Sequence, residues 1–129
     1  MQKKLIDTNV LLRYLLHDDE KMFQMSTQII DDGAFTLPEI LAEVVYVLRN
    51  VYKFERNDIA KSSMQILDDV EIEPNEVVIY AVKIFADTNL DFVDCIILAH
   101  HKVFGTEIFS FDKKLNNQRK RIDAENLSD

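Results

Sequence analysis

Four acidic residues lie inside apolar stretches of the chain, where a carboxylate has little contact with water. They are Asp7, Glu43, Asp94 and Asp112. A carboxylate that is partly withdrawn from water needs a cation or several hydrogen-bond donors, and none of the four stretches contains a Lys or Arg of its own. Several carboxylates without matching bases form the ligand set that a hard divalent cation such as Mg²⁺ requires. The residues alone therefore raise the hypothesis of a metal site.

Each of these acids also has an ordinary structural explanation. Asp91 and Asp94 are spaced like a helix N-cap and its third helical residue, so capping alone would explain both. Asp7 and Asp112 are residues that often occupy turns. Spacing alone leaves both interpretations open, although the structural one needs a separate reason for each acid.

The predicted elements place the acids at one edge of the fold. Short strands are expected at 3–7, 34–37, 70–72 and 107–110, separated by helices at 9–16, 20–30, 38–52, 58–68, 75–87 and 92–103, with a short basic helix after 112. We expect Asn57 or Asp58 to cap the helix that ends near 68. Strands that alternate with long helices predict an α/β fold with a parallel sheet covered by helices on both faces. Ligands bind such folds at the carboxyl ends of the strands, where Asp7 ends the first strand and Asp112 follows the last.

Length and composition bound the class of protein. A chain of 129 residues with 47% hydrophobic and 29% charged residues is expected to be a single globular domain spanning 1–129. Only two Gly and two Pro favour long regular elements. The sequence contains no apolar run long enough to cross a membrane and no signal peptide, so we expect a cytoplasmic protein.

The charge distribution bears on nucleic-acid binding. A net charge of −8 argues against a nucleic-acid partner, but five basic residues crowd one short segment. They are Lys113, Lys114, Arg119, Lys120 and Arg121. A possible RNA-binding surface and a merely solvated one are both open interpretations of this segment.

The segments around the four acids resemble the acidic motifs of PIN domains, and within that family those of the VapC-type toxins. The segments are Ile6-Asp7-Thr8-Asn9-Val10-Leu11, Glu43-Val44-Val45-Tyr46-Val47-Leu48, Asp91-Phe92-Val93-Asp94-Cys95-Ile96 and Phe109-Ser110-Phe111-Asp112-Lys113-Lys114. The resemblance covers essentially the whole chain, in order and at family-like spacing. Cys95 departs mildly from it, since a small residue such as Ala is usual there.

The resemblance implies a fold and a set of roles. The fold would be a three-layer α/β/α arrangement around a short central parallel sheet of four or five strands. The four acids would bind Mg²⁺ or Mn²⁺, with Asn9 and Ser110 supporting them by hydrogen bonds and Asp91 as a further acid. A metal-activated water would hydrolyse RNA, leaving a 5′-phosphate and a 3′-hydroxyl. A cognate antitoxin protein and a homodimer are the partners that it implies.

Two other interpretations remain open from the sequence. The first is a catalytically idle PIN-like domain that serves as a binding module. The second is a receiver-like phosphotransfer domain, which would need a second acid after the first strand, where this chain has Thr8 and Asn9. His100 and His101 do not suggest a metal pair, because neighbouring helical residues diverge by about 100°.

Overall fold

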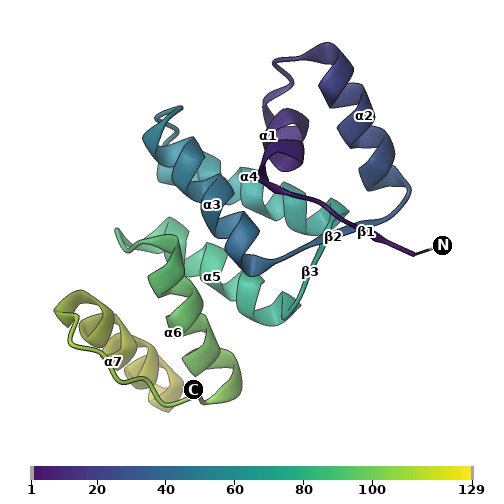
Figure 1. Cartoon of the computed structure of the whole chain (residues 1–129). Helices are drawn as coiled ribbons and strands as arrows, with labels where there is room; N and C mark the ends of the chain where they lie inside the picture. The colour runs from purple at the N-terminus through teal and green to yellow at the C-terminus, as the bar shows by residue number, and fades with distance from the viewer. Residues whose placement is uncertain (1, 129) are drawn as a thin grey trace.

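Three short parallel strands form the centre of the fold in the computed structural model, which describes residues 2–128 (Figure 1). The strands are β1 (Lys4–Leu5), β2 (Ala34–Thr36) and β3 (Glu71–Ile72), in the sheet order β1-β2-β3. Lys4 pairs with Ala34, and Thr36 pairs with Ile72. The buried Thr36 hydroxyl donates to the Ile6 carbonyl at 2.7 Å, which extends the contact between β1 and β2. The predicted α/β fold with a parallel sheet is confirmed.

Seven helices surround these strands within the described residues. They are α1 (Thr8–Leu16), α2 (Glu20–Asp31), α3 (Pro38–Asn50), α4 (Arg56–Asp69), α5 (Asn75–Asp87), α6 (Phe92–Phe104) and α7 (Lys113–Ser128). Local sequence sets many of their ends: the carboxylate of Asp19 caps α2, Pro38 occupies the first turn of α3, and Gly105 ends α6 with a positive φ of 70°. The predicted caps Asn57 and Asp58 are wrong, because α4 begins one residue before them and Glu55 precedes it.

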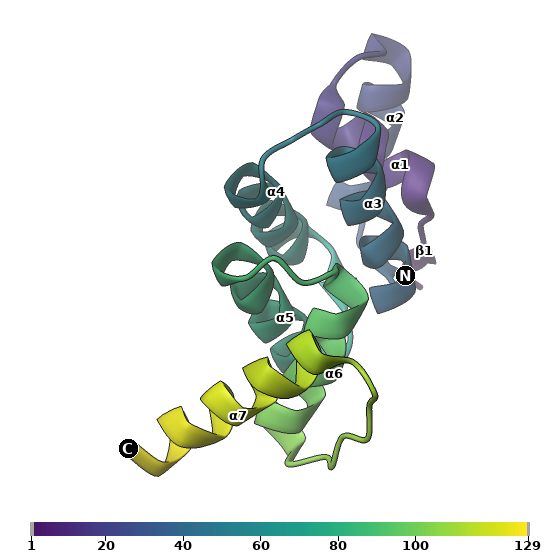
Figure 2. The same cartoon turned by 90° about the vertical axis from the view of Figure 1, so that its left-hand side faces the viewer.

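The elements are arranged in chain order along the molecule. In two perpendicular views, α1 and α2 lie at one end and α7 lies at the opposite end (Figures 1 and 2). Helix α6 packs against α3, α5 and α7, so it connects α7 to the rest of the fold. Within residues 2–128, no helix has the length and apolar character needed to cross a membrane.

The core is built from aliphatic side chains of the strands and helices. Leu11, Leu41, Ile72 and Leu98 are fully buried. Cys95 is buried among them, and burial raises the pKa of its thiol to about 12. A thiol with so high a pKa remains protonated, so Cys95 acts as a small apolar core residue rather than as a nucleophile.

Among residues 2–128 the sheet has three strands, not the four or five that the resemblance implied. The predicted strand at 107–110 is absent, and the segment between α6 and α7 is irregular although its exposure alternates as in a strand. A strand needs a paired neighbour and a buried face. Here Phe109 and Phe111 face solvent and the Ser110 carbonyl accepts from the side chain of Asn116, so the segment contacts α7 instead of β1.

Candidate metal centre

The first two candidate acids lie on α1 and α3, which pack against each other. Asp7 follows β1 and is the N-cap of α1, where its Oδ1 accepts from the Val10 backbone N–H at 3.1 Å. Glu43 is exposed in the middle of α3, and the Thr8 hydroxyl donates to its Oε2 at 2.8 Å. Thr8, which directly follows Asp7, therefore holds the Glu43 carboxylate near the start of α1. No role for Thr8 was predicted from the sequence, although a hydroxyl next to Asp7 was a signal that could have pointed to it.

Asp94, the third candidate acid, lies in the first turn of α6 and is half-buried. Burial raises the pKa of its carboxyl, and the charges of Asp112 and Asp91 raise that pKa further. Among residues 2–128 it has no hydrogen-bond or ion-pair partner. Asp91 occupies the N-cap position of α6, but its side chain makes no capping hydrogen bond. Neither carboxylate therefore caps α6, so helix capping does not explain this pair of acids.

The fourth acid, Asp112, is held at the start of α7. Its Oδ1 accepts from the Leu115 backbone N–H at 2.9 Å, as an N-cap does. The Ser110 hydroxyl accepts from the Asp112 backbone N–H at 3.0 Å, and the Ser110 carbonyl accepts from Asn116 at 2.8 Å. Ser110 thus shapes the turn that carries Asp112. Asn9 is exposed, and its side chain has no hydrogen-bond partner within the described part of the chain.

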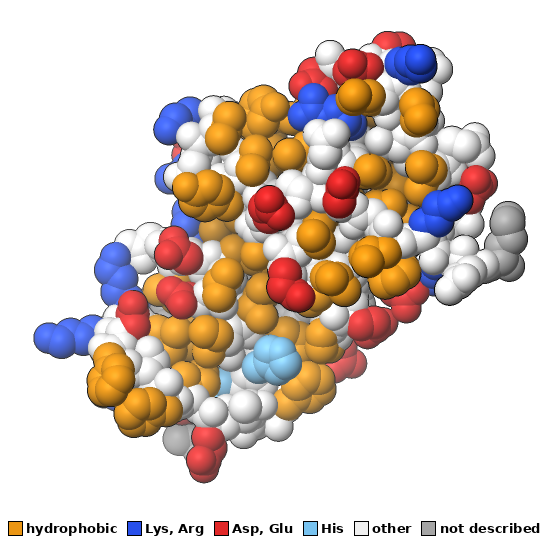
Figure 3. Space-filling view, in the orientation of Figure 1, with side chains coloured by type: hydrophobic (Ala, Val, Ile, Leu, Met, Phe, Trp, Pro, Cys, Tyr) orange, Lys and Arg blue, Asp and Glu red, His pale blue; other side chains and the backbone are white. Residues whose placement is uncertain are grey.

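The acids form two groups rather than one closed cluster. Asp94 interacts electrostatically with Asp91 and Asp112, while Thr8 links Asp7 to Glu43. No three Asp, Glu, His or Cys side chains among residues 2–128 lie close enough to hold one ion. Figure 3 shows acidic side chains scattered among hydrophobic ones across the face that carries α1, α3 and α6, with Lys and Arg mostly toward its margins. Carboxylate oxygens are ligands that suit a hard cation, although the four carboxylates do not converge on one point.

A pocket of about 500 Å³ lies between α3 and the start of α6. Asp91, Asp94, Tyr46 and two arginines, Arg49 and Arg56, are among its lining residues. Both arginines are engaged with backbone carbonyls: that of Phe54 for Arg49, and those of Phe85 and Leu90 for Arg56. Neither forms an ion pair with the two acids, so the pocket keeps carboxylates that a cation or a cationic ligand can approach. Tyr46 and Arg56 could not be assigned to the site from the sequence. The packing of α3 on α6 brings Tyr46 there, and hydrogen bonds to the Phe85 and Leu90 carbonyls hold Arg56, the first residue of α4, beside it.

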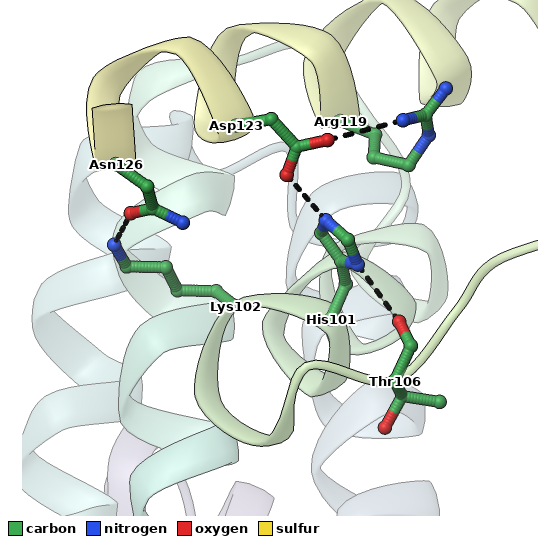
Figure 4. Close-up of polar contacts among 6 residues, drawn as sticks. All are labelled: His101, Lys102, Thr106, Arg119, Asp123 and Asn126. Atoms are coloured by element: carbon green, nitrogen blue, oxygen red, sulfur yellow. Dashed lines mark hydrogen bonds and ion pairs between the residues drawn. The ribbon is translucent and has the colours of Figure 1, made fainter. Parts of the chain in front are cut away.

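The basic segment lies on α7, and its five residues differ in their surroundings. Lys113, Lys114, Lys120 and Arg121 are exposed, whereas Arg119 forms an ion pair with Asp123 at 3.1 Å. Asp123 also contacts His101 of α6. The His101 ring lies between the Asp123 carboxylate and the Thr106 carbonyl (Figure 4). A second contact, Lys102 to Asn126, links the same two helices. His101 therefore has a structural role, and His100 lies beside Phe104 instead.

Comparisons with known proteins agree with this description. The sequence model of the family described as PIN domain matches residues 4–121, a range that includes all four acids. A VapC ribonuclease of Aquifex aeolicus (strain VF5) is 33% identical over 121 residues, covering 86% of this chain and 88% of that protein. No solved structure matches the chain.

Proposed function

Because the chain belongs to the PIN domain family and is a VapC-type protein, we propose that it is a metal-dependent endoribonuclease. We further propose that it is the toxin of a type II toxin–antitoxin pair and acts in the cytoplasm. The name of its relative in Aquifex aeolicus, a VapC ribonuclease, supports RNA as the substrate. Membership of this family replaces the receiver-like interpretation.

One observation carries the proposal: Asp94 is half-buried beside two other acids and has no cationic partner among the described residues. A carboxylate in that setting is costly unless a cation is bound nearby. Asp7, Glu43, Asp94 and Asp112 would hold Mg²⁺ or Mn²⁺, which when bound lowers the pKa of a water and offsets charge on the phosphate.

The other residues of the site would position these ligands. Thr8 orients the Glu43 carboxylate through its hydrogen bond, and Ser110 fixes the turn that carries Asp112. Glu43 or Asp94 would accept the proton of the attacking water. Lys113 and Lys114, exposed beside Asp112, would contact RNA phosphates. We also propose a homodimer, because Met22, Met25, Tyr46 and Val51 leave apolar surface exposed on α2, on α3 and at the end of α3.

A catalytically idle binding module of the same family is the second candidate function. The separation of the acids into two groups favours it, since no three ligands are gathered among residues 2–128. The two functions differ in whether the protein cleaves RNA.

Incubation of the purified protein with single-stranded RNA, in Mg²⁺ or Mn²⁺ and in EDTA, tests the proposal. We expect cleavage only with metal, and products that carry a 5′-phosphate and a 3′-hydroxyl. Asp112→Asn should lose activity by several orders of magnitude, whereas Asp68→Asn, a change of an exposed acid on α4, should not. RNA that stays intact under every metal condition would leave the idle binding module as the better account.

A further inference from the structure

Two phenylalanine rings are displayed on the surface where α6 connects to α7. The side chains of Phe109 and Phe111 are 86% and 92% exposed, more than any other large hydrophobic side chain of the described residues. Their rings lie edge to face, with centroids 5.2 Å apart and planes at 81°. Most aromatic residues contribute their area to a core or an interface, so two adjacent exposed rings indicate a binding surface.

The segment that carries the rings is fixed on both sides. At its start, the Thr106 carbonyl accepts from His101 at 2.8 Å (Figure 4), and at its end the Ser110 carbonyl accepts from Asn116. Between them, Ile108 packs against the core. The rings therefore project from an anchored segment, and a ligand that binds them meets surfaces that are already ordered.

The chain that follows the rings is strongly basic. After Asp112, residues 113–121 contain five basic and no acidic residues, while the chain as a whole has a net charge of −8. Lys113 and Lys114 are exposed at the start of α7. Exposed aromatic rings next to lysines are the combination with which proteins hold single-stranded nucleic acid, because bases stack on the rings and phosphates meet the cations.

A groove lies between α7 and the segment that joins α5 to α6. The groove, of about 240 Å³, is lined by Lys114 and Arg121 of α7 and by residues 87–90, which lead directly into Asp91. The rings also immediately precede Asp112. The groove and the rings are thus each adjacent in sequence to a candidate acid, Asp91 and Asp112 respectively.

We propose that Phe109 and Phe111 form a stacking platform for unpaired bases of single-stranded RNA, with Lys113 and Lys114 on the adjacent phosphates. The proposal deepens the proposed function and rests on it, since it takes RNA to be the substrate. It assigns the choice of unpaired RNA to a surface that lies outside the four acids. Any base can stack, so the platform selects strands that are single rather than strands of one sequence.

Binding in EDTA tests the platform separately from cleavage, because the RNA stays intact there under the proposed mechanism. Fluorescence anisotropy with a short labelled single-stranded RNA should give a dissociation constant that rises about tenfold or more in the double variant Phe109→Leu/Phe111→Leu. Phe104→Leu, which changes another exposed ring at the end of α6, should leave it unchanged. An abasic strand of the same length should bind wild type and double variant equally, because it offers nothing to stack.

A tryptophan variant gives a direct signal of stacking. The chain contains no Trp, so Phe109→Trp introduces a single indole whose fluorescence should be quenched by the normal strand and not by the abasic one. This variant keeps an aromatic ring, and its affinity for RNA should remain near that of the wild type.

Three results would overturn the proposal. The first is an undetectable affinity of the wild type for single-stranded RNA, and the second is equal affinity of wild type and double variant. The third is a drop in molecular mass of the double variant in light scattering with RNA binding unchanged, which would assign the rings to a contact between proteins. Intact RNA in Mg²⁺ together with ring-dependent binding would contradict the nuclease and leave the platform in place.

Discussion

The chemistry proposed for this protein depends most on the surroundings of Asp94. Its carboxyl is half-buried, and burial, Asp112 and Asp91 all raise its pKa, so its charged form is disfavoured in the protein without metal. A capping role would have offered it backbone donors, but none is used. The nearby Arg49 and Arg56 are committed to backbone carbonyls. A bound cation would relieve this arrangement, and so the residue should respond to metal in measurements of stability.

Asp94→Asn should change stability in opposite directions with and without metal. In EDTA the variant should melt at a higher temperature than the wild type, because a repelled charge is removed. Mn²⁺ at a hundred times its dissociation constant should stabilise the wild type by roughly 2.7 kcal/mol, and the variant should lose most of that gain. Thermal melts of both proteins and of Asp68→Asn measure this. A wild-type melting temperature that is indifferent to Mn²⁺ would count against the site.

Thr8→Val removes the hydroxyl that orients Glu43 while keeping the size and shape of the side chain. We expect the rate of RNA cleavage to fall by about tenfold or more, as is usual when a hydrogen bond behind a metal ligand is lost. The melting temperature should change little, because the hydrogen bond joins exposed groups. Thr8→Ser, which retains the hydroxyl, should keep most of the activity. Full activity of Thr8→Val would show that the contact does not matter to catalysis.

At the scale of elements, the sequence predicted the helices well and the sheet less well. Strong caps and Pro38, Pro74 and Gly105 mark helix ends that can be read locally, and α5 begins and ends where its pattern predicts. The prediction of a strand at 107–110 was wrong, because alternating apolar residues do not identify a neighbouring strand with which the segment can pair. In the same way, Asp94 could be singled out from its apolar surroundings, whereas Tyr46 of α3 and Arg56 of α4 join the site only through tertiary packing.

The contact between α6 and α7 should depend on pH through His101. The Thr106 carbonyl and the Asp123 carboxylate only accept hydrogen bonds at neutral pH, so both ring nitrogens donate and the ring is charged. The hydrogen bond to Asp123, and then that to Thr106, raises the pKa of His101, while His101 lowers the pKa of Asp123. The stabilisation is complete between the ordinary values, 3.8 for Asp and 6.5 for His, and declines as pH rises through the raised pKa of His101. It also declines as pH falls through the lowered pKa of Asp123.

The difference in melting temperature between wild type and Asp123→Asn, followed against pH, measures this contact. We expect a difference that is largest in the mildly acidic range and smaller in alkaline buffer. In a His101→Gln background the alkaline decline should vanish, leaving the part that comes from the ion pair between Arg119 and Asp123. A difference that stays constant from about pH 5 to about pH 9 would show that His101 does not titrate in this contact.

At the scale of the whole molecule, basic residues gather on α7 although the net charge is negative. The net charge is −8, yet α7 begins with a basic stretch beside the exposed aromatic rings. The pocket between α3 and α6 presents Asp91 and Asp94 beside Tyr46 and Phe92. RNA phosphates would meet the basic stretch of α7, whereas a basic protein segment would meet the acids of the pocket. An antitoxin could therefore block the acids while α7 stays accessible.

We predict that an antitoxin inserts a basic side chain among the acids. Arginine suits this role because its planar group meets carboxylates with two parallel hydrogen bonds. The complex should form quickly and weaken with added salt, since charges are screened over about 8–10 Å at ordinary ionic strength. Expressing the neighbouring reading frame together with this chain, and purifying through a tag on this chain, should recover a small protein with a basic segment. Expression of this chain alone should arrest growth. The toxin role would be lost if neither result is obtained.

We propose that acids from both groups take part in the metal-dependent cleavage of RNA. The rate of RNA cleavage as a function of Mn²⁺ concentration, measured for wild type, Asp7→Asn and Asp94→Asn, tests it most directly. We expect wild type to cleave RNA only with Mn²⁺, and each variant to need at least about tenfold more Mn²⁺ or to lose activity altogether. Cleavage by wild type in EDTA, or a variant of either group with the metal dependence and rate of the wild type, would contradict it.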